Sequence, residues 1–206
     1  MPSPSSPSDF WDDKFSRPGY LYGVEPNSWL VSQRYRLKTG MRVLCVGDGE
    51  GRNGVWLAQQ GMEVMSVDSS PVALRKSMKL AMDRNTKLMT HCADLVTWHW
   101  PREAYDAVVA IFLHFPPTVR PAIHVAMAGA LRPGGILLME AFRPEQIKNG
   151  AGGPRNPSLL YTPDTLRTDF EELTIEELAA WDGVLDEGPG HQGQSATTRL
   201  VARKPK

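Results

Sequence analysis

The sequence predicts an α/β fold in which helices cover a mostly parallel β-sheet. Three observations lead to this prediction. Short apolar runs alternate with helical segments of about a dozen residues. The first apolar run ends in a glycine-rich turn. Two long extended segments joined by another glycine-containing turn close the chain. The 206 residues suffice for one domain with a sizeable core.

The N-terminal part of the chain divides into two segments of different composition. Residues 1–9 are rich in Pro and Ser and contain neither a basic residue nor an apolar run, so we expect a disordered start that is not a signal peptide. Residues 10–206 are expected to form a single domain. Its first part, residues 10–38, is rich in aromatic residues and is expected to form one or two helices.

The elements of the predicted sheet follow in order along the domain. Strands are expected at 42–47, 63–68, 87–92, 105–111 and 136–142, with helices at 52–60, 71–85 and 118–131. The strands are mainly continuous apolar runs, as expected when helices bury both faces of a sheet. Gly61 occupies the stop position of the first helix, and Pro71 opens the second. Right-handed crossovers between such strands make them parallel.

The pattern changes after the fifth predicted strand. Residues 149–157 form a Gly/Pro-rich loop, and a short helix is expected to begin near Pro163. Extended segments at 173–186 and 196–203 flank a turn at 188–193. These segments predict an antiparallel hairpin added to one edge of the sheet.

Composition limits the partners and the setting. The formal net charge is zero, whereas a protein that holds a phosphate backbone carries a basic surplus, so we expect no nucleic-acid partner. No apolar stretch approaches the ~20 residues that span a bilayer, so no membrane partner is expected. Cys45 and Cys92 form neither a disulfide framework nor a metal-ligand cluster. We therefore expect a cytoplasmic monomer or weak homodimer without a metal, acting on a small molecule.

A glycine-rich segment follows the first predicted strand. Residues 43–54 read VLCVGDGEGRNG, which places Gly47, Gly49 and Gly51 between a strand and a helix. Glycine lets the backbone turn sharply and lets a ligand approach the main chain. Asp68 ends the second strand, 21 residues after Gly47. Because a carboxylate at that place accepts hydrogen bonds from both hydroxyls of a ribose, a ligand with a nucleoside is expected.

The charges of this loop discriminate between two ligand classes. A dinucleotide site has the pattern G-x-G-x-x-G, whose third glycine falls on Arg52 here. It also holds a pyrophosphate at the helix N-terminus, where Asp48 and Glu50 would repel it. S-adenosylmethionine (SAM) has no phosphate and carries a sulfonium and an ammonium group, so acids are tolerated. The loop therefore favours SAM, with S-adenosylhomocysteine (SAH) as product, over NAD. The alternative is a tight turn in a nucleotide-free α/β fold.

Two further segments agree with this interpretation. Asp94 follows the third strand, where an adenine would lie, and its carboxylate is suited to accept from the adenine amino group. An aspartate that caps a helix or turn is the alternative for this residue. Ile111, Phe112 and Leu113 follow the fourth strand, beside the methionine part of such a ligand.

Several motifs together resemble a known family. The segments VLCVGDGEGRNGVWLA, VDSSPVAL, CADL, YDAVVAIFLHFPP and LRPGGILLMEAF resemble the class I SAM-dependent methyltransferases. The glycine loop with its following RNxxxLA and the N-terminal FWDDKFSRPGYLYGVEPNSWL resemble the tellurite-resistance and thiopurine methyltransferase-like branch. The C-terminal GAGGPRNPSLL and DEGPGHQGQSA resemble small bacterial members of that branch. The resemblance covers residues 10–204, nearly the whole chain.

The resemblance implies an architecture and a set of ligand contacts. The fold would be a Rossmann-like three-layer sandwich with seven strands in the order 3-2-1-4-5-7-6 and an antiparallel last strand. The implied cofactor contacts are Gly47, Gly49 and Gly51 under the methionine moiety, Asp68 at the ribose, Ser69, Asp94 and Leu95 at the adenine, Ile111 and Phe112 as walls, and Trp11, Tyr20, Tyr22 and Trp29 in a lid over SAM. Many members also place an acid at the end of the first strand, where this chain has Gly47, so that its role would move to Asp48 or Glu50.

The methyl acceptor is not fixed by these motifs. Soft nucleophiles such as thiolates, selenides or tellurium oxyanions need little base catalysis, whereas an oxygen or amine acceptor usually needs a base. His114, just past the fourth strand, is the candidate base or a substrate contact, and the alternative is a histidine that caps the strand end. His191 in the hairpin turn, and Arg143 and Arg155 beside the Gly/Pro loop, are candidate substrate contacts or plainly solvated side chains.

Three functions therefore compete. The favoured one is a small-molecule methyltransferase with a thiol, selenium or tellurium acceptor. The second is methylation of an oxygen or nitrogen on a metabolite, with His114 as base. The third is a non-catalytic SAM-binding protein. The run HFPPT at 114–118 lacks the acid or amide that amino-methyltransferases of DNA and protein often carry there, which argues against nucleic-acid modification.

Overall fold

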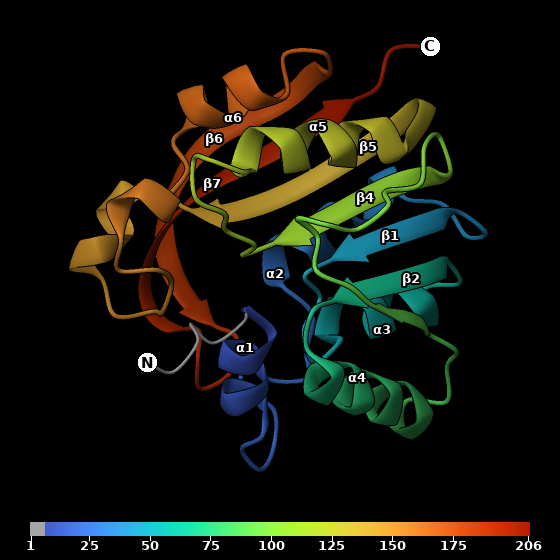
Figure 1. The fold of residues 1–206 in the computed structure, drawn as a ribbon, viewed down its shortest axis with the longest axis vertical. Helices are drawn as coiled ribbons and strands as arrows, with labels where there is room; N and C mark the ends of the chain where they lie inside the picture. Colours follow the sequence, from blue (N-terminus) through green and yellow to red (C-terminus); the bar gives the residue numbers. More distant parts are fainter. Residues whose placement is uncertain (1–6) are drawn as a thin grey trace.

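A computed structural model describes residues 7–206, which form a seven-stranded sheet with helices on both faces (Figure 1). The strand order is β3-β2-β1-β4-β5-β7-β6, which confirms the predicted order 3-2-1-4-5-7-6. The strands are β1 (Arg42–Val46), β2 (Glu63–Asp68), β3 (Met89–Cys92), β4 (Tyr105–Ile111), β5 (Leu131–Phe142), β6 (Thr174–Asp186) and β7 (Gln192–Arg203). The α-helices are α1 (Pro7–Phe15), α2 (Ser28–Ser32), α3 (Arg52–Gln59), α4 (Pro71–Asp83), α5 (Arg120–Ala130) and α6 (Pro163–Asp169). Three short 3-10 helices, η1 (Arg34–Arg36), η2 (Pro144–Lys148) and η3 (Pro157–Leu159), complete the described fold.

The pairing of the strands follows from the connections between them. β1 to β5 pair in parallel, whereas β7 pairs antiparallel with both β5 and β6. The β6–β7 hairpin thus occupies one edge of the sheet, as the sequence predicts. β1 lies between β2 and β4. The chain adds β2 and β3 on one side of β1, and then returns to add β4 and β5 on the other side. Such a reversal of strand order opens a crevice at the carboxyl ends of the strands.

Alternate residues of each central strand enter two different cores. Leu44 and Val46 of β1 pack in the core under α5 and α6, together with Met127. Val43 and Cys45 face the opposite core under α2 and α3. This division follows from the period of two along a strand, and it explains why the central strands are apolar throughout. The predicted three-layer sandwich is therefore present.

Several element boundaries differ from the prediction by a few residues. Pro7–Asp9 form the first turn of α1 rather than a disordered start, while residues 1–6 lie outside the described part of the chain. β5 begins at Leu131 instead of Ile136, because Leu131 pairs with Tyr105 across an irregularity in the ladder. No helix in residues 7–206 combines the length and the apolar character that crossing a membrane requires.

Candidate functional site

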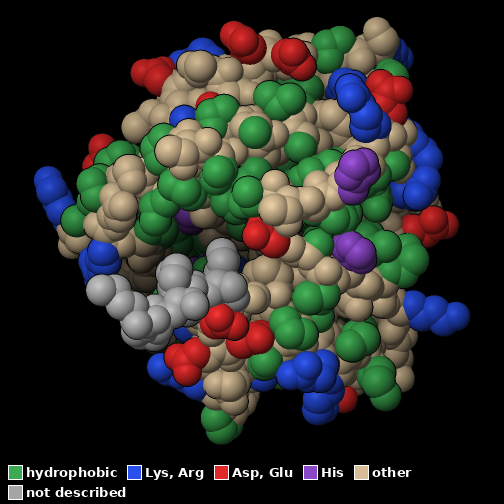
Figure 2. All heavy atoms as spheres, viewed as in Figure 1, with side chains coloured by type: hydrophobic (Ala, Val, Ile, Leu, Met, Phe, Trp, Pro, Cys, Tyr) green, Lys and Arg blue, Asp and Glu red, His purple; other side chains and the backbone are tan. Residues whose placement is uncertain are grey.

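A cavity of about 850 Å³ opens at the carboxyl ends of β1, β2 and β4. Helix α1 and residues 21–23 close one side of it, and the loop at 152–156 closes the other. In the view of Figure 2, hydrophobic side chains gather around a hollow on this face of the molecule. The cavity therefore lies in the crevice that the strand order creates.

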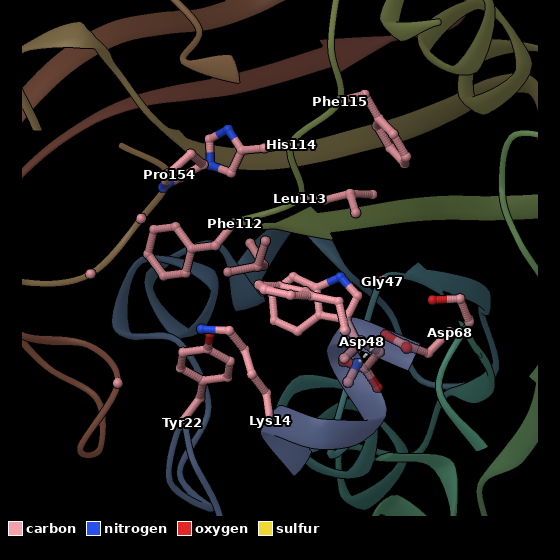
Figure 3. Close-up of a pocket in the computed structure, with 18 of the residues that line it drawn as sticks. Lys14, Tyr22, Gly47, Asp48, Asp68, Phe112, Leu113, His114, Phe115 and Pro154 are labelled. Carbon is pink, nitrogen blue, oxygen red and sulfur yellow. Dashed lines mark hydrogen bonds between the residues drawn. The ribbon is translucent and has the colours of Figure 1, made fainter. Parts of the chain in front are cut away.

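The cavity has two halves with different linings, which lie on opposite sides of Figure 3. We call the first the glycine-loop half; its residues are Gly47, Asp48, Gly49, Glu50, Asp68, Ser69, Ala93, Asp94, Leu95, Ile111 and Leu113. We call the second the hairpin half; its residues are Lys14, Tyr22, Phe112, His114, Phe142, Gly152, Gly153, Pro154, Arg155, Asn156, Leu159, Gly190 and His191. Within residues 7–206, all the carboxylates that line the cavity belong to the glycine-loop half.

The first two glycines of the loop line the cavity in left-handed conformations. Gly47 has φ +61°, and a Cβ there would meet Leu113 Cδ1 at 2.6 Å. Gly49 has φ +55° and faces the ring of Phe15 from α1. Non-glycine residues adopt such angles at a cost, and a side chain would fill the space at the loop. The glycines thus keep the main chain accessible to a ligand.

The third glycine has a different role from the predicted one. Gly51 is not among the residues that line the cavity. It precedes α3 with φ +86°, and a Cβ there would lie 2.4 Å from the Cβ of Ser77 in α4. Gly51 therefore lets α3 and α4 pack closely, so that the expected contact with a ligand is replaced by a structural role.

Asp68 lies at the carboxyl end of β2 with both carboxylate oxygens fixed. Oδ2 accepts from Gly49 N (2.8 Å) and Oδ1 accepts from Ser70 N (2.9 Å). Burial raises the pKa of this carboxyl, and the backbone N–H donors oppose the rise. Each oxygen retains a lone pair beyond its single backbone bond. The side chain is thereby oriented toward the cavity with capacity for hydroxyl donors.

The two acids of the loop have separate partners. Asp48 accepts from Ser66 Oγ (2.8 Å) and from Gly54 N (3.3 Å), and burial raises its pKa to about 7. Glu50 instead accepts from Leu21 N (2.7 Å) and pairs with Lys76 Nζ (2.8 Å). Glu50 thus fastens the N-terminal segment to the fold, whereas Asp48 is held between β2 and α3 and also lines the cavity.

The remaining residues of the glycine-loop half form a slot with mainly apolar walls. Leu95 and Ile111 are buried and line it, and Ser69 borders it after β2. Asp94 lines the mouth of the slot, while its Oδ1 accepts from Val96 N (2.9 Å) as in an Asx-turn. Both interpretations of Asp94 therefore hold geometrically, because its second carboxylate oxygen has no partner among the described residues.

Aromatic rings from the N-terminal segment cover the cavity. Trp11 stacks on Phe15 (5.5 Å between ring centroids), and Phe15 meets Tyr22 edge to face. Tyr22 in turn stacks on His191 of the hairpin turn at 4.2 Å. The rings of Trp11 and Tyr22 thus lie where a lid is predicted. Trp29 does not, because it is buried in the core under α2.

Tyr20, the fourth aromatic residue predicted for the lid, packs elsewhere. Its ring contacts the small core formed by α3 and α4, and its hydroxyl donates to Lys76 O (3.3 Å). Tyr20 therefore helps to seat the N-terminal segment on α4 and does not line the cavity.

A buried polar network anchors the end of this lid segment. Asn27 Nδ2 donates to Glu140 Oε2 (2.7 Å) on β5 and to Glu187 Oε1 (3.2 Å) beyond β6. Glu187 also forms a buried ion pair with Arg52 Nη2 at 2.8 Å, and Glu140 pairs with Arg199 Nε at 2.7 Å. The network joins the lid segment, the helix after the glycine loop and the hairpin.

Phe112 occupies a strained position at the end of β4. Its φ is +55°, although β4 otherwise has ordinary strand geometry. The ring stacks on Phe142 (4.5 Å) and meets His191 edge to face (4.5 Å). A bulky residue in this backbone region costs of order 1 kcal/mol or more and is typical of functional sites. The strain turns Phe112 toward the hairpin half of the cavity (Figure 3).

Both ring nitrogens of His114 have partners within the protein. Nδ1 lies 2.7 Å from Leu159 O, and Phe142 N donates to Nε2 at 3.2 Å. Because a carbonyl accepts only from a donor, Nδ1 carries the proton and Nε2 is the acceptor. Burial lowers the pKa of His114 to about 4. His114 therefore joins η3 to the end of β5, and neither nitrogen is free to take a proton.

The other predicted substrate contacts divide into two groups. His191 is 5% exposed and lines the cavity, its Nδ1 has no partner within residues 7–206, and burial lowers its pKa to about 3. Arg155 lies at the rim and donates to Ile147 O (3.1 Å). Arg143 does not line the cavity; it pairs with Glu145 and Asp182, each at 2.5 Å. Its two carboxylate partners therefore remove Arg143 from the predicted set.

Sequence reasoning did not identify Lys14, Asn27 and Glu187. Lys14 lies in the last turn of α1, where a lysine is unremarkable because it suits the helix dipole. Asn27 and Glu187 meet across 160 positions of sequence. The one local signal was Asn27 before a helix, which is an ordinary N-cap.

The donor set of the glycine-loop half suits a ligand that combines a nucleoside with a positive charge. Asp68 presents paired oxygens for hydroxyls, Leu95 and Ile111 form an apolar slot for a flat base, and Asp48 offers a carboxylate near the glycine turn. A pyrophosphate would meet these acids without a neutralising cation from Lys76 or Arg52, since both already pair with glutamates. The residues present therefore fit a cationic nucleoside better than a dinucleotide.

Comparisons with known proteins agree with this geometry. Residues 43–135 match a methyltransferase domain family. The chain is 32% identical over 117 residues to a protein of Arabidopsis thaliana named probable thiol methyltransferase 2, covering 55% of this chain and 50% of that protein. The chain thus spans about half the length of the curated relative that it matches.

Solved structures share the fold at low sequence identity. TehB from Haemophilus influenzae superposes with a TM-score of 0.71 at 20% identity, over 96% of this chain and 66% of that one. The N-methyltransferase NodS from Bradyrhizobium japonicum WM9, in complex with SAH, gives a TM-score of 0.71 at 16% identity, over 97% and 98%. At these identities the likeness concerns the fold alone.

Proposed function

We propose that the chain is a class I SAM-dependent methyltransferase, and that it transfers the methyl group of SAM to a small, soft nucleophile such as a thiol or a selenium or tellurium species. One observation carries the choice of acceptor. Among the described residues, the hairpin half, where an acceptor would lie, contains no carboxylate, and its His114 has both nitrogens engaged. An acceptor that needs a general base is poorly served by such a site.

The glycine-loop half would hold SAM. Asp68 would bind the ribose hydroxyls, Leu95 and Ile111 would enclose the adenine, and Asp48 would face the amino-acid part, where its carboxylate suits an ammonium group. When bound, SAM supplies an activated methyl group on a sulfonium. The carboxylates of this half would stabilise that positive charge, and the acids that line the cavity gather in this half.

The lid would exclude water and face the reacting centre with aromatic rings. Trp11 and Tyr22 line the cavity and belong to the segment that the network around Asn27 fastens to the sheet. Ring faces attract a cation electrostatically, and removal of water strengthens the attraction. The chain thereby aligns two reactants in one closed space, which is the main contribution that an in-line displacement requires.

The neutral histidines support a reaction without proton abstraction. Burial lowers the pKa of His191 to about 3 and that of His114 to about 4, so both are uncharged and weakly basic at neutral pH. A thiolate or another soft anion arrives already deprotonated. A cytoplasmic, reducing setting belongs to the same proposal, because Cys45 and Cys92 are both free thiols.

Two other functions are separated from this one by experiment. The purified protein is incubated with SAM and with thiol, selenite, tellurite, catechol and amine acceptors, and SAH formation is measured. We expect turnover with soft acceptors and none with the amine. His114→Asn keeps a donor close to the position of Nδ1, so we expect its pH–rate profile to keep the wild-type shape.

The contrary outcomes identify the alternatives. Turnover confined to catechol or amine, with an acid limb of the pH–rate profile lost in His114→Asn, would indicate an O- or N-methyltransferase with His114 as base. SAM binding without turnover of any acceptor would indicate a non-catalytic SAM-binding protein.

A further inference from the structure

Lys14 places a positive charge inside the hairpin half of the cavity. It lies in the last turn of α1, lines the cavity, and rises toward Tyr22 and Phe112 in Figure 3. Its ammonium lies 5.0 Å from the ring centroid of Phe10. No carboxylate in residues 7–206 lies within ion-pair distance of it, whereas Lys76 on the neighbouring α4 is paired with Glu50.

The surroundings of Lys14 favour a negative partner from outside the protein. The hairpin half has aromatic walls at Phe112 and Phe142, and these walls weaken the screening of a charge by water. His191 adds to the same half a buried Nδ1 that has no partner in the described part of the chain. An anionic ligand therefore stabilises a lysine ammonium in this half of the cavity more than it would stabilise an ammonium exposed to solvent.

The other cations around the cavity are already occupied or lie at its rim. Arg52 is paired with the buried Glu187 at 2.8 Å. Arg155 is exposed and donates to the carbonyls of Ile147 and Asn149, so it adds positive charge only at the mouth. The cavity is therefore polarised, with carboxylates around the proposed SAM position and Lys14 in the half that remains for the acceptor.

We infer that Lys14 is a specificity-determining residue that binds the negative charge of the acceptor, so that small soft anions are preferred over neutral molecules of the same size. This inference rests on the proposed function. When the methyl carbon leaves sulfur and bonds to the acceptor, the bonding pair stays on sulfur and the acceptor loses one negative charge. The product therefore binds Lys14 more weakly than the substrate does.

The test measures anion binding separately from SAM-site binding. Wild type, Lys14→Met and Lys14→Arg are saturated with SAH and titrated calorimetrically with thiocyanate, a soft monoanion whose charge does not change with pH. Methionine keeps the length and helix propensity of lysine without its charge. Lys79→Met is the matched control, because Lys79 is an exposed lysine that pairs with Asp83 on the surface of α4.

We expect thiocyanate to bind the wild-type SAH complex and to bind Lys14→Met at least about 10-fold more weakly, as for a lost charge-assisted contact. Lys14→Arg should recover most of the affinity, Lys79→Met should match wild type, and SAH affinity should be equal in all four proteins. Equal thiocyanate affinity in wild type and Lys14→Met, or no thiocyanate binding to an SAH-saturated protein, would overturn the inference while leaving the proposed function intact. Failure of SAH itself to bind would overturn the proposed function.

Discussion

Replacement of Asn27 by alanine should destabilise the protein far more than the loss of one polar side chain on its surface. Asn27 has no exposed surface and connects three elements. Its Oδ1 caps α2 by accepting from Leu30 N (2.7 Å). Its Nδ2 donates to carboxylates of Glu140 (2.7 Å) and Glu187 (3.2 Å). Alanine removes all three bonds and leaves an N–H and two carboxylates with fewer partners.

The expected magnitude follows from these contacts. Loss of an N-cap costs about 1 kcal/mol. A hydrogen bond to a charged group contributes about 1.5–3 kcal/mol, and a buried acceptor left unsatisfied adds to the loss. Glu140 retains Thr197 and Arg199, and Glu187 retains Arg52, which limits the damage. We therefore expect Asn27→Ala to reduce the free energy of unfolding by about 4 kcal/mol.

The assay is equilibrium unfolding in urea. We expect the slope of the free energy of unfolding against urea concentration to be unchanged, so that the midpoints of the proteins compare directly. The matched control is Asn156→Ala, which removes an exposed cap that accepts from Ser158 N (3.0 Å), and its loss should stay below about 1 kcal/mol. Asn27→Asp keeps the cap but sets a third carboxylate against Glu140 and Glu187, so its deficit should shrink as the pH falls and the introduced carboxylate is protonated. A loss below about 1.5 kcal/mol for Asn27→Ala would refute the assignment of this network as the anchor of the lid.

Two further predictions concern the glycine loop. Gly51→Ala should destabilise the protein by at least about 2 kcal/mol more than Gly40→Ala in urea unfolding, because a Cβ at Gly51 meets Ser77 at 2.4 Å. Gly40 has a similar positive φ but open space around it. Equal losses of stability would show that backbone strain alone determines the cost of the substitution. The pKa of Asp48 is about 7 in the folded protein and about 4 when unfolded, so folding takes up a proton between these values and stability falls as the pH rises through that range. Asp48→Asn should remove this dependence, so that the Tm of the variant minus that of wild type grows from pH 4 to pH 7 and is then level. A constant difference would contradict a raised pKa of this buried carboxyl.

The sheet and the glycine-loop half were predictable because their signals are local. β2 and β4 have the predicted bounds, since each is a short apolar run between turn residues. Asp68 and Gly47 lie at fixed offsets from strand ends, so their places in the cavity follow once the strands are parallel. Ile111 could be placed for the same reason.

The hairpin half could not be predicted, because tertiary contacts decide it. His114 looks the same in sequence whether its nitrogens are free or bonded, and its partners lie 45 and 28 positions away. Arg143 follows a strand end, as a substrate-binding arginine would, yet a carboxylate on β6 occupies it. Lys14 reaches the cavity because α1 lies across it. The sequence of this short helix has low amphipathicity and does not predict where the helix packs.

In the proposed function, the glycine-loop half binds SAM through Asp68. Isothermal titration of the purified protein with SAM, SAH and NAD tests it most directly. Asp68→Ala removes the predicted ribose contact, and Glu63→Ala, an exposed acid at the other end of β2, is the control. We predict binding of SAM and SAH by wild type and Glu63→Ala, its loss in Asp68→Ala, and no binding of NAD. Undiminished SAM affinity in Asp68→Ala would exclude Asp68 as the ribose contact, and binding of NAD in place of SAM would exclude SAM as the ligand.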